Sequence, residues 1–343
     1  MNKSLNILKC IAAICVINMH CTYYDSSKPG IIIDAIIRFA VPIFFMISGY
    51  YSYFKKEDIN KAEKYKNRII KIVGLIILSW IVYVPSRYLL FGRNVGFIEY
   101  FKNLYNEESI FKLIFLNISP LAGHLWFLYA LVYCYILVLI LNKYDININK
   151  LYKYIPILLF VSIILGEFSI FTGRQILPIY IRNFWMYALP YFLMGYLINE
   201  RKIYNKVSNK SIYLIGILSI ISVIIERLGV SKYDMYIGTI SLSIVIFIWC
   251  INNANISGFN ILAWIGKNIS SYIYLLHLSV LWILENMEKQ RNINVKDICY
   301  INTVMVFVIT VIISVFIYMC KKVYANYMKK IKVVRDENKR NII

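Results

Sequence analysis

Ten long apolar stretches, separated by short charged segments, constrain this chain more than any other feature of its sequence. The stretches cover 4–22, 31–54, 69–90, 123–142, 154–172, 183–199, 210–228, 235–252, 268–287 and 299–320. Crossing a bilayer as a helix takes about 20 apolar residues. The sequence therefore predicts an all-α polytopic membrane protein with about ten transmembrane helices. We interpret the first stretch as a retained span, because Lys9 interrupts what would be the apolar core of a signal peptide.

The distribution of positive charge predicts which side of the membrane each segment faces. The chain has 38 Lys and Arg against 18 Asp and Glu. With the N-terminus in the cytoplasm, 24 basic residues fall in cytoplasmic segments and 12 in outer ones, as the positive-inside rule requires. Both termini are then expected to be cytoplasmic, with a membrane domain over 1–325 and a basic cytoplasmic tail over 326–343. The positive charge faces anionic lipid, so we expect the bilayer and no nucleic acid as a partner.

All three histidines of the chain lie in or at the edge of apolar stretches, where ionisable groups are costly and often functional. They are His20, His124 and His277. A single buried histidine is more often a satisfied core residue than a catalyst. For His20 the sequence favours a function, whereas for His124 and His277 both interpretations stay open.

Lys9 and His20 are eleven residues apart in the first span, so they lie on one face of a helix and about 16 Å apart along it. Lys9 is expected toward the cytoplasm, where a cation can hold an anionic ligand. His20 is expected toward the exterior, where an imidazole can move a proton near neutral pH. The structural alternative is that Lys9 extends to the inner headgroups.

The second span contains Asp34 and Arg38, four residues apart, so that an ion pair within one helix is available. Pro42 and the Ser48-Gly49 pair are expected to break the regular helix. Backbone groups freed in a membrane must be satisfied by protein or water. The pattern therefore predicts a cavity beside this span, although a structural kink with a charge pair is the alternative.

Arg68 and Lys71, three residues apart, open the third span after a dense basic run. A pair with this spacing lies on one helix face, and both side chains suit phosphate groups. The alternative is that they are positive-inside residues without a further function.

Taken together, these segments resemble the acyltransferase-3 family of bacterial membrane acyltransferases. The resemblance rests on Lys9 and His20, on RFAVPIFFMISGYY (38–51), on RIIK (68–71), on GHLWFLYALV (123–132) and on SSYIYLLHLSVLW (270–282). The family typically has a second arginine where this chain has Lys71, which keeps the charge but loses the bidentate guanidinium.

The resemblance implies an O-acyltransferase of the bacterial plasma membrane, with acetyl as the expected acyl group and no amino-acyl transfer. Acetyl-CoA or another acyl-CoA is the expected cytoplasmic co-substrate, and a hydroxyl of an extracytoplasmic polysaccharide or envelope glycan is the acceptor. The expected catalytic residues are His20, Lys9 and Arg38, and the expected coenzyme-binding residues are Lys9, Arg68 and Lys71. Asp34, Ser48, Tyr50, His124, Trp126 and His277 are expected to line the site.

Within this interpretation, His20 is the expected base, and transient acylation of His20 is an open variant. Arg38, Tyr50 or backbone N–H groups around Ser48-Gly49 are the candidate donors to the reaction's oxyanion. The seven cysteines show no metal-type spacing, and we expect no metal site.

Two other functions stay open. Some family members form the membrane module of amino-acid racemases and are associated with serine uptake, so a transporter is the alternative function. No racemase domain is expected after the last span of this chain. A non-catalytic partner of an exopolysaccharide export machine is the third interpretation.

Overall fold

The computed structural model describes residues 2–21, 28–55, 57–172, 176–229, 233–290 and 299–340, and this part of the chain contains helices and no strand. The α-helices are α1 (Lys3–His20), α2 (Lys28–Ile36), α3 (Ala40–Tyr50), α4 (Lys61–Arg87), α5 (Phe97–Leu104), α6 (Glu107–Leu116), α7 (Trp126–Lys143), α8 (Tyr154–Leu165), α9 (Pro178–Ile181), α10 (Leu189–Glu200), α11 (Asn209–Gly229), α12 (Ile237–Asn252), α13 (Asn260–Asn268), α14 (Ser270–Gln290) and α15 (Cys299–Arg340). Short 3-10 or π-helical segments are η2 (Ile37–Phe39), η3 (Tyr88–Gly92), η4 (Gly123–Leu125), η5 (Ile148–Leu151), η6 (Glu167–Thr172), η7 (Phe184–Ala188) and η8 (Ile203–Lys206). The all-α prediction is confirmed for these residues.

Six helical segments of the described chain are long and apolar enough to cross a membrane. They are Pro29–Tyr50, Lys61–Gly92, Gly123–Lys143, Ile148–Ser169, Asn209–Gly229 and Thr303–Met328. Each coincides with one of the ten predicted stretches, and α12 is a shorter apolar helix. The chain is therefore a multi-pass membrane protein. The count of ten spans and the cytoplasmic position of both termini stay predictions.

The connection between the third and fourth predicted stretches contains two short helices, α5 and α6. Asn106 begins α6, because its side chain accepts a hydrogen bond from the backbone N–H of Ser109 at 2.8 Å. Such a cap makes a helix favourable even in a connection.

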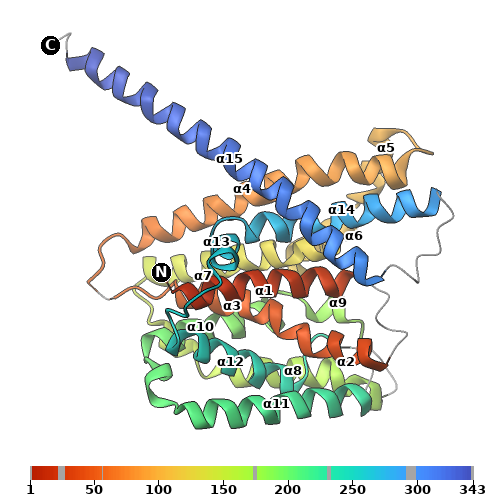
Figure 1. Cartoon of the computed structure of the whole chain (residues 1–343), viewed down its shortest axis with the longest axis vertical. Coiled ribbons are helices and arrows are strands. Elements are labelled where there is room, and N and C mark those ends of the chain that lie inside the picture. The colour runs from red at the N-terminus through yellow and green to blue at the C-terminus, as the bar shows by residue number, and fades with distance from the viewer. Residues whose placement is uncertain are drawn as a thin grey trace.

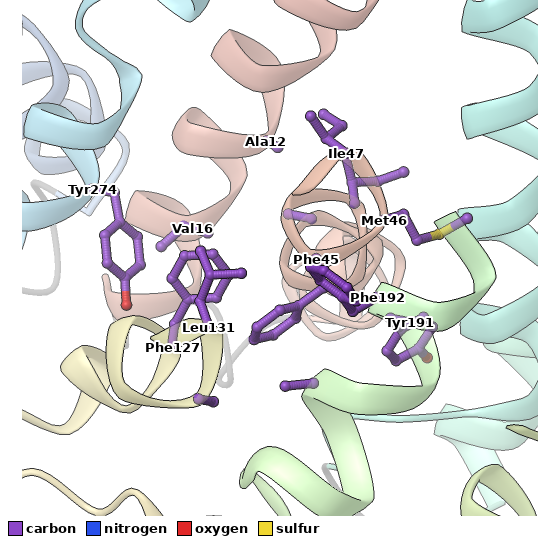
Figure 2. Packing of buried hydrophobic residues seen from close by; sticks show 14 of the residues in the cluster. Ala12, Val16, Phe45, Met46, Ile47, Phe127, Leu131, Tyr191, Phe192 and Tyr274 are labelled. Atoms are coloured by element: carbon purple, nitrogen blue, oxygen red, sulfur yellow. The ribbon is translucent and has the colours of Figure 1, made fainter. Parts of the chain in front are cut away.

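The core lies where α1, α3, α7 and α10 meet (Figure 2). Figure 2 shows Val16 of α1, Phe45 of α3 and Phe127 of α7 turned toward the same space. The rings of Phe45 and Phe127 have their centroids 4.5 Å apart. Burial of large aromatic side chains supplies much of the packing energy of such a junction.

The bend in the second span lies at η2, between α2 and α3, rather than at Ser48-Gly49. Pro42 has no N–H for the carbonyl of Arg38 four residues earlier, and the chain adopts a 3-10 turn over Ile37–Phe39. The helix then continues through Ser48 and Gly49, where the Ser48 hydroxyl donates to the carbonyl of Phe44 at 2.8 Å. The predicted break at these two residues was wrong.

Gly49 instead allows α3 and α10 to approach each other closely. A Cβ atom on Gly49 would lie 1.9 Å from the carbonyl oxygen of Phe192, and one on Gly195 would lie 2.0 Å from that of Met46. The two glycines therefore bring the backbones of α3 and α10 together from both sides. This is the packing that small residues allow between membrane helices.

α15 crosses the other helices, and its C-terminal half projects beyond them (Figure 1). It runs from Cys299 to Arg340 without a break at residue 325, where the sequence placed the start of the basic tail. The division into a membrane domain that ends at residue 325 and a basic cytoplasmic tail stays a prediction.

Candidate active site

The three histidines of the chain meet at one place, from three elements far apart in the sequence. His20 ends α1, His124 lies in η4 and His277 lies in α14. The ring centroids are 4.8 Å apart for His124 and His277, 5.1 Å for His20 and His277, and 6.1 Å for His20 and His124. The sequence predicted three site residues, and the structure brings them into one cluster.

The hydrogen bonds of His277 determine which of its ring nitrogens carries the proton. Its Nδ1 lies 2.6 Å from the carbonyl oxygen of Tyr274, which can only accept. Nδ1 is therefore the donor, and in the neutral ring Nε2 has a free lone pair. This Nε2 is buried and has no hydrogen-bond partner in the described structure.

The tautomer of His124 follows from Tyr83. The Tyr83 hydroxyl donates its only proton to the carbonyl of Leu275 at 2.8 Å and accepts from the N–H of Ser279 at 3.2 Å. The Nε2 atom of His124 lies 3.4 Å from the same oxygen, so Nε2 must be the donor of that contact. Nδ1 of His124 is then the acceptor nitrogen, and it is buried without a partner in the part of the chain described.

A cavity of about 240 Å³ opens beside this cluster. His20 and His124 line it, together with Arg38 and Trp126, as the sequence predicted. The other lining residues are Val16, Met19, Val41, Phe44, Phe127, Arg182, Tyr187, Asp234 and Tyr274. The cavity therefore combines polar groups that could do chemistry with a largely aromatic wall, as small-molecule sites commonly do.

Arg38 belongs to a buried network of four charges at the edge of the cavity. Its Nε and Nη2 atoms donate to Asp34 at 3.2 and 2.8 Å, which confirms the predicted ion pair within the second span. Its Nη1 atom donates to Asp234, which also accepts from Nε and Nη2 of Arg182. These contacts use three of the five guanidinium N–H donors of Arg38 and leave two for a ligand.

Asp234 is ionised at any physiological pH. It lies before α12, and burial alone would raise its pKa, but the nearby guanidinium groups of Arg182 and Arg38 outweigh that effect and lower the pKa to about 2. The two carboxylates balance the two guanidinium groups, so the network has no net charge.

Asp34 does not line the cavity but contacts Arg38, which does, and neither Ser48 nor Tyr50 lines it. Ser48 bonds to its own helix, and its neighbouring backbone N–H groups belong to α3. The ring of Tyr50 packs on Tyr51 and Phe247, with centroids 5.4 and 5.7 Å away. The oxyanion donors that the sequence placed around Ser48-Gly49 and Tyr50 are therefore absent from this cavity.

Lys9 does not border the cavity either. Its side chain is half-buried, and Nζ lies 5.9 Å from the centroid of the Tyr51 ring. Because α1 rises about 1.5 Å per residue, Lys9 and His20 are separated by about 16 Å of helix. The described cavity lies at the His20 end of α1 and Lys9 does not line it, so the site role expected for Lys9 stays a prediction.

Arg68 lies next to the same tyrosine. Its Nη1 donates to the Ser52 hydroxyl at 2.7 Å and its Nη2 to the carbonyl of Tyr51. The guanidinium carbon lies 5.2 Å from the centroid of the Phe54 ring. Lys71 is exposed on α4. The structure thus brings Arg68 to the carbonyl of Tyr51 and Lys9 near its ring, whereas Lys71 is exposed.

Arg182, Asp234, Tyr187 and Tyr274 are site residues that the sequence analysis missed. Arg182 and Asp234 lie in connections between apolar stretches, where charged residues are common and give no signal. Arg182 and Asp234 each lie directly before an apolar stretch, but this position does not distinguish them from other charged residues at the ends of spans. In the described part of the chain, no group of three His, Cys, Asp or Glu side chains has a geometry that could hold a metal ion.

The chain is similar to known proteins. A family model described as an acyltransferase domain matches residues 2–320. The serine/alanine racemase of Enterococcus gallinarum is 29% identical over 138 residues, which are 38% of this chain and 18% of that protein. The similarity thus spans less than a fifth of that relative. No solved structure matches the chain.

Proposed function

This chain belongs to the acyltransferase-3 family, and we propose that it is an O-acyltransferase of the bacterial plasma membrane. The proposed donor is cytoplasmic acyl-CoA, with acetyl as the first acyl group to test. The proposed acceptor is a hydroxyl of an extracytoplasmic polysaccharide or envelope glycan. The sidedness follows the positive-inside bias, which puts the His20 end of α1 toward the exterior.

The observation that carries this proposal is the His20 cavity. An acceptor hydroxyl is a weak nucleophile and needs a base, and His20 lines the cavity with His124 beside it. The aromatic wall of Trp126, Phe127 and Tyr187 offers flat apolar faces on which a sugar ring can rest. Membership of an acyltransferase family and a base in an aromatic cavity support the same reaction.

The proposed reaction needs a base, an oxyanion donor and a leaving group. A nitrogen of His20 takes the hydroxyl proton while the hydroxyl oxygen forms a bond to the thioester carbon. The C–S bond then breaks, and the CoA thiolate takes the proton back from His20. Arg38 is the proposed donor to the oxyanion, through the two N–H groups that Asp34 and Asp234 leave available.

The cytoplasmic end supplies the proposed binding site for the coenzyme. Arg68 donates to the carbonyl of Tyr51, Nζ of Lys9 lies 5.9 Å from the centroid of the Tyr51 ring, and Lys71 is exposed on the next turn of α4. Three cations near one end of the helices suit the phosphates of coenzyme A. The thioester of the bound coenzyme would then have to reach from the Lys9 end of α1 to the His20 end.

Mass spectrometry of envelope glycans tests the proposed function. Cells with and without the gene are compared, and the mass of each glycan fragment is scanned for an acyl group that disappears with the gene. Loss of an ester-bound acetyl, restored by a plasmid copy, supports the proposal. Identical acyl patterns in both strains, with serine accumulating in vesicles that contain the protein and no acyl donor, would replace it with the transporter function.

A further inference from the structure

His277 has no part in the reaction proposed above, although it is the histidine nearest to both of the others. It is fully buried on α14 and does not line the cavity. Its ring lies behind the two cavity-lining imidazoles, 5.1 Å from that of His20 and 4.8 Å from that of His124. In catalytic constellations the base is commonly oriented by a third group that accepts a hydrogen bond from it.

The Nε2 atom of His277 needs a donor, and only one of its two neighbouring rings can supply it. The bond from Nδ1 to Tyr274 leaves Nε2 as a buried acceptor without a partner. His124 cannot donate to it, because the Nε2 proton of His124 points to Tyr83 and its Nδ1 is itself an acceptor. His20 is the only ring of the three whose proton is not assigned by another contact.

We infer that His277 is a positioning residue for His20. Its Nε2 accepts the N–H of His20, which fixes the His20 ring and leaves the other ring nitrogen free to take the acceptor's proton. When that proton arrives, the same bond stabilises the imidazolium, and no proton passes to His277. We expect this bond to form when the acceptor is bound, since catalytic hydrogen bonds are often long without substrate and shorten in its complex. This inference rests on the proposed function.

Two substitutions separate the positioning role from a structural one. His277→Asn keeps an N–H that can donate to the Tyr274 carbonyl but has no atom at the place of Nε2. His277→Gln carries a carbonyl oxygen that can reach this place and accept. Labelled acetyl-CoA is the donor, and glycan isolated from the strain without the gene is the acceptor. Thr310→Val is the control, because its buried hydroxyl bonds only to the backbone of its own helix.

The inference predicts that His277→Asn lowers kcat at least about tenfold, leaves KM for acetyl-CoA unchanged, and is partly rescued in His277→Gln. Thr310→Val should keep the wild-type kcat. A wild-type kcat in His277→Asn, while His20→Ala is inactive, would overturn the inference and leave the proposed function standing. Equal losses in the Asn and Gln variants would also overturn it. A wild-type protein that transfers no acetyl would overturn both.

A second measurement has a readout other than catalytic activity. Because the chain has three histidines, nitrogen NMR of protein labelled with ¹⁵N-histidine can assign each tautomer. His20→Ala leaves two rings, and we expect one protonated at Nδ1 and the other at Nε2. If both rings were protonated at Nε2, His277 would have no lone pair for His20, and the inference would be wrong.

Discussion

Arg38 and Asp234, which are 196 positions apart in the chain, form a buried ion pair that joins the second span to the connection before α12. Their side chains are 5% and 16% exposed. Asp234 also accepts two hydrogen bonds from Arg182, so one carboxylate connects three segments at the edge of the cavity.

Asp234→Asn should destabilise the folded protein, because it leaves the buried guanidinium group of Arg38 and the partly exposed one of Arg182 with one carboxylate between them. Breaking such a pair by removing one partner costs about 3–5 kcal/mol. Thermal unfolding of the detergent-solubilised protein measures the change. Glu108→Gln, which removes the exposed pair with Lys112, is the control and should leave the midpoint unchanged. Equal midpoints for all three proteins would show that the network contributes nothing to stability.

The stabilisation by Asp234 should persist to low pH. Burial opposes ionisation, but Arg182 and Arg38 lower its pKa from 3.8 to about 2. A carboxylate with a lowered folded pKa stabilises the fold above its unfolded pKa, and this contribution is lost as the pH falls toward the folded value. The stability difference between wild type and Asp234→Asn should be constant from neutral pH to about pH 5 and shrink below about pH 4. A difference that already shrinks near pH 6 would contradict the assignment.

Gly49→Ala should disrupt the contact between α3 and α10, since its Cβ would lie 1.9 Å from the carbonyl oxygen of Phe192. Backbone cannot yield as a flexible side chain can, so we expect a cost of about 3 kcal/mol or more. Gly74→Ala on α4 is the matched control, because no atom lies within 4 Å of its added Cβ. Alanine is the better helix former there, and stability should rise by up to about 1 kcal/mol. Similar melting temperatures for the two variants would mean that α3 and α10 are not in close contact.

Arg68→Ala should weaken donor binding more than Lys71→Ala. Arg68 is held beside Tyr51 by hydrogen bonds, whereas Lys71 is exposed and free to move. A charge-assisted contact to phosphate is worth about 1.5–3 kcal/mol, so KM for acetyl-CoA should rise at least about tenfold in Arg68→Ala. Steady-state assays of CoA release, run with the glycan acceptor present, measure KM. An unchanged KM in Arg68→Ala would place the phosphates elsewhere.

The sequence predicted those site residues that are polar or ionisable and lie inside apolar stretches. Histidines and an Asp34–Arg38 pair inside apolar stretches have an energetic price in a membrane, and this made them recognisable as site residues. The proximity of the His20 and His277 rings results from the packing of α1 against α14. This packing could not be predicted from the sequence of either helix alone.

Other parts of the fold and site could not be predicted, because their residues are of types that are common in the segments where they occur. Arg182 and Asp234 lie in connections, where a charge costs nothing until the fold buries it. Gly49 has the local pattern of a helix breaker, yet the backbone of Phe192 gives it a packing role that only the tertiary structure reveals. The absence of Lys9 from the cavity likewise depends on the side chains that fill the space between it and His20.

The central claim is that acyl transfer takes place in the cavity lined by His20, and complementation of the gene-deleted strain with His20→Ala tests it most directly. The variant should reach the membrane in wild-type amount and restore no acyl ester to the envelope glycan, while the wild-type copy restores it fully. An acyl ester restored to the wild-type level by His20→Ala would contradict the claim.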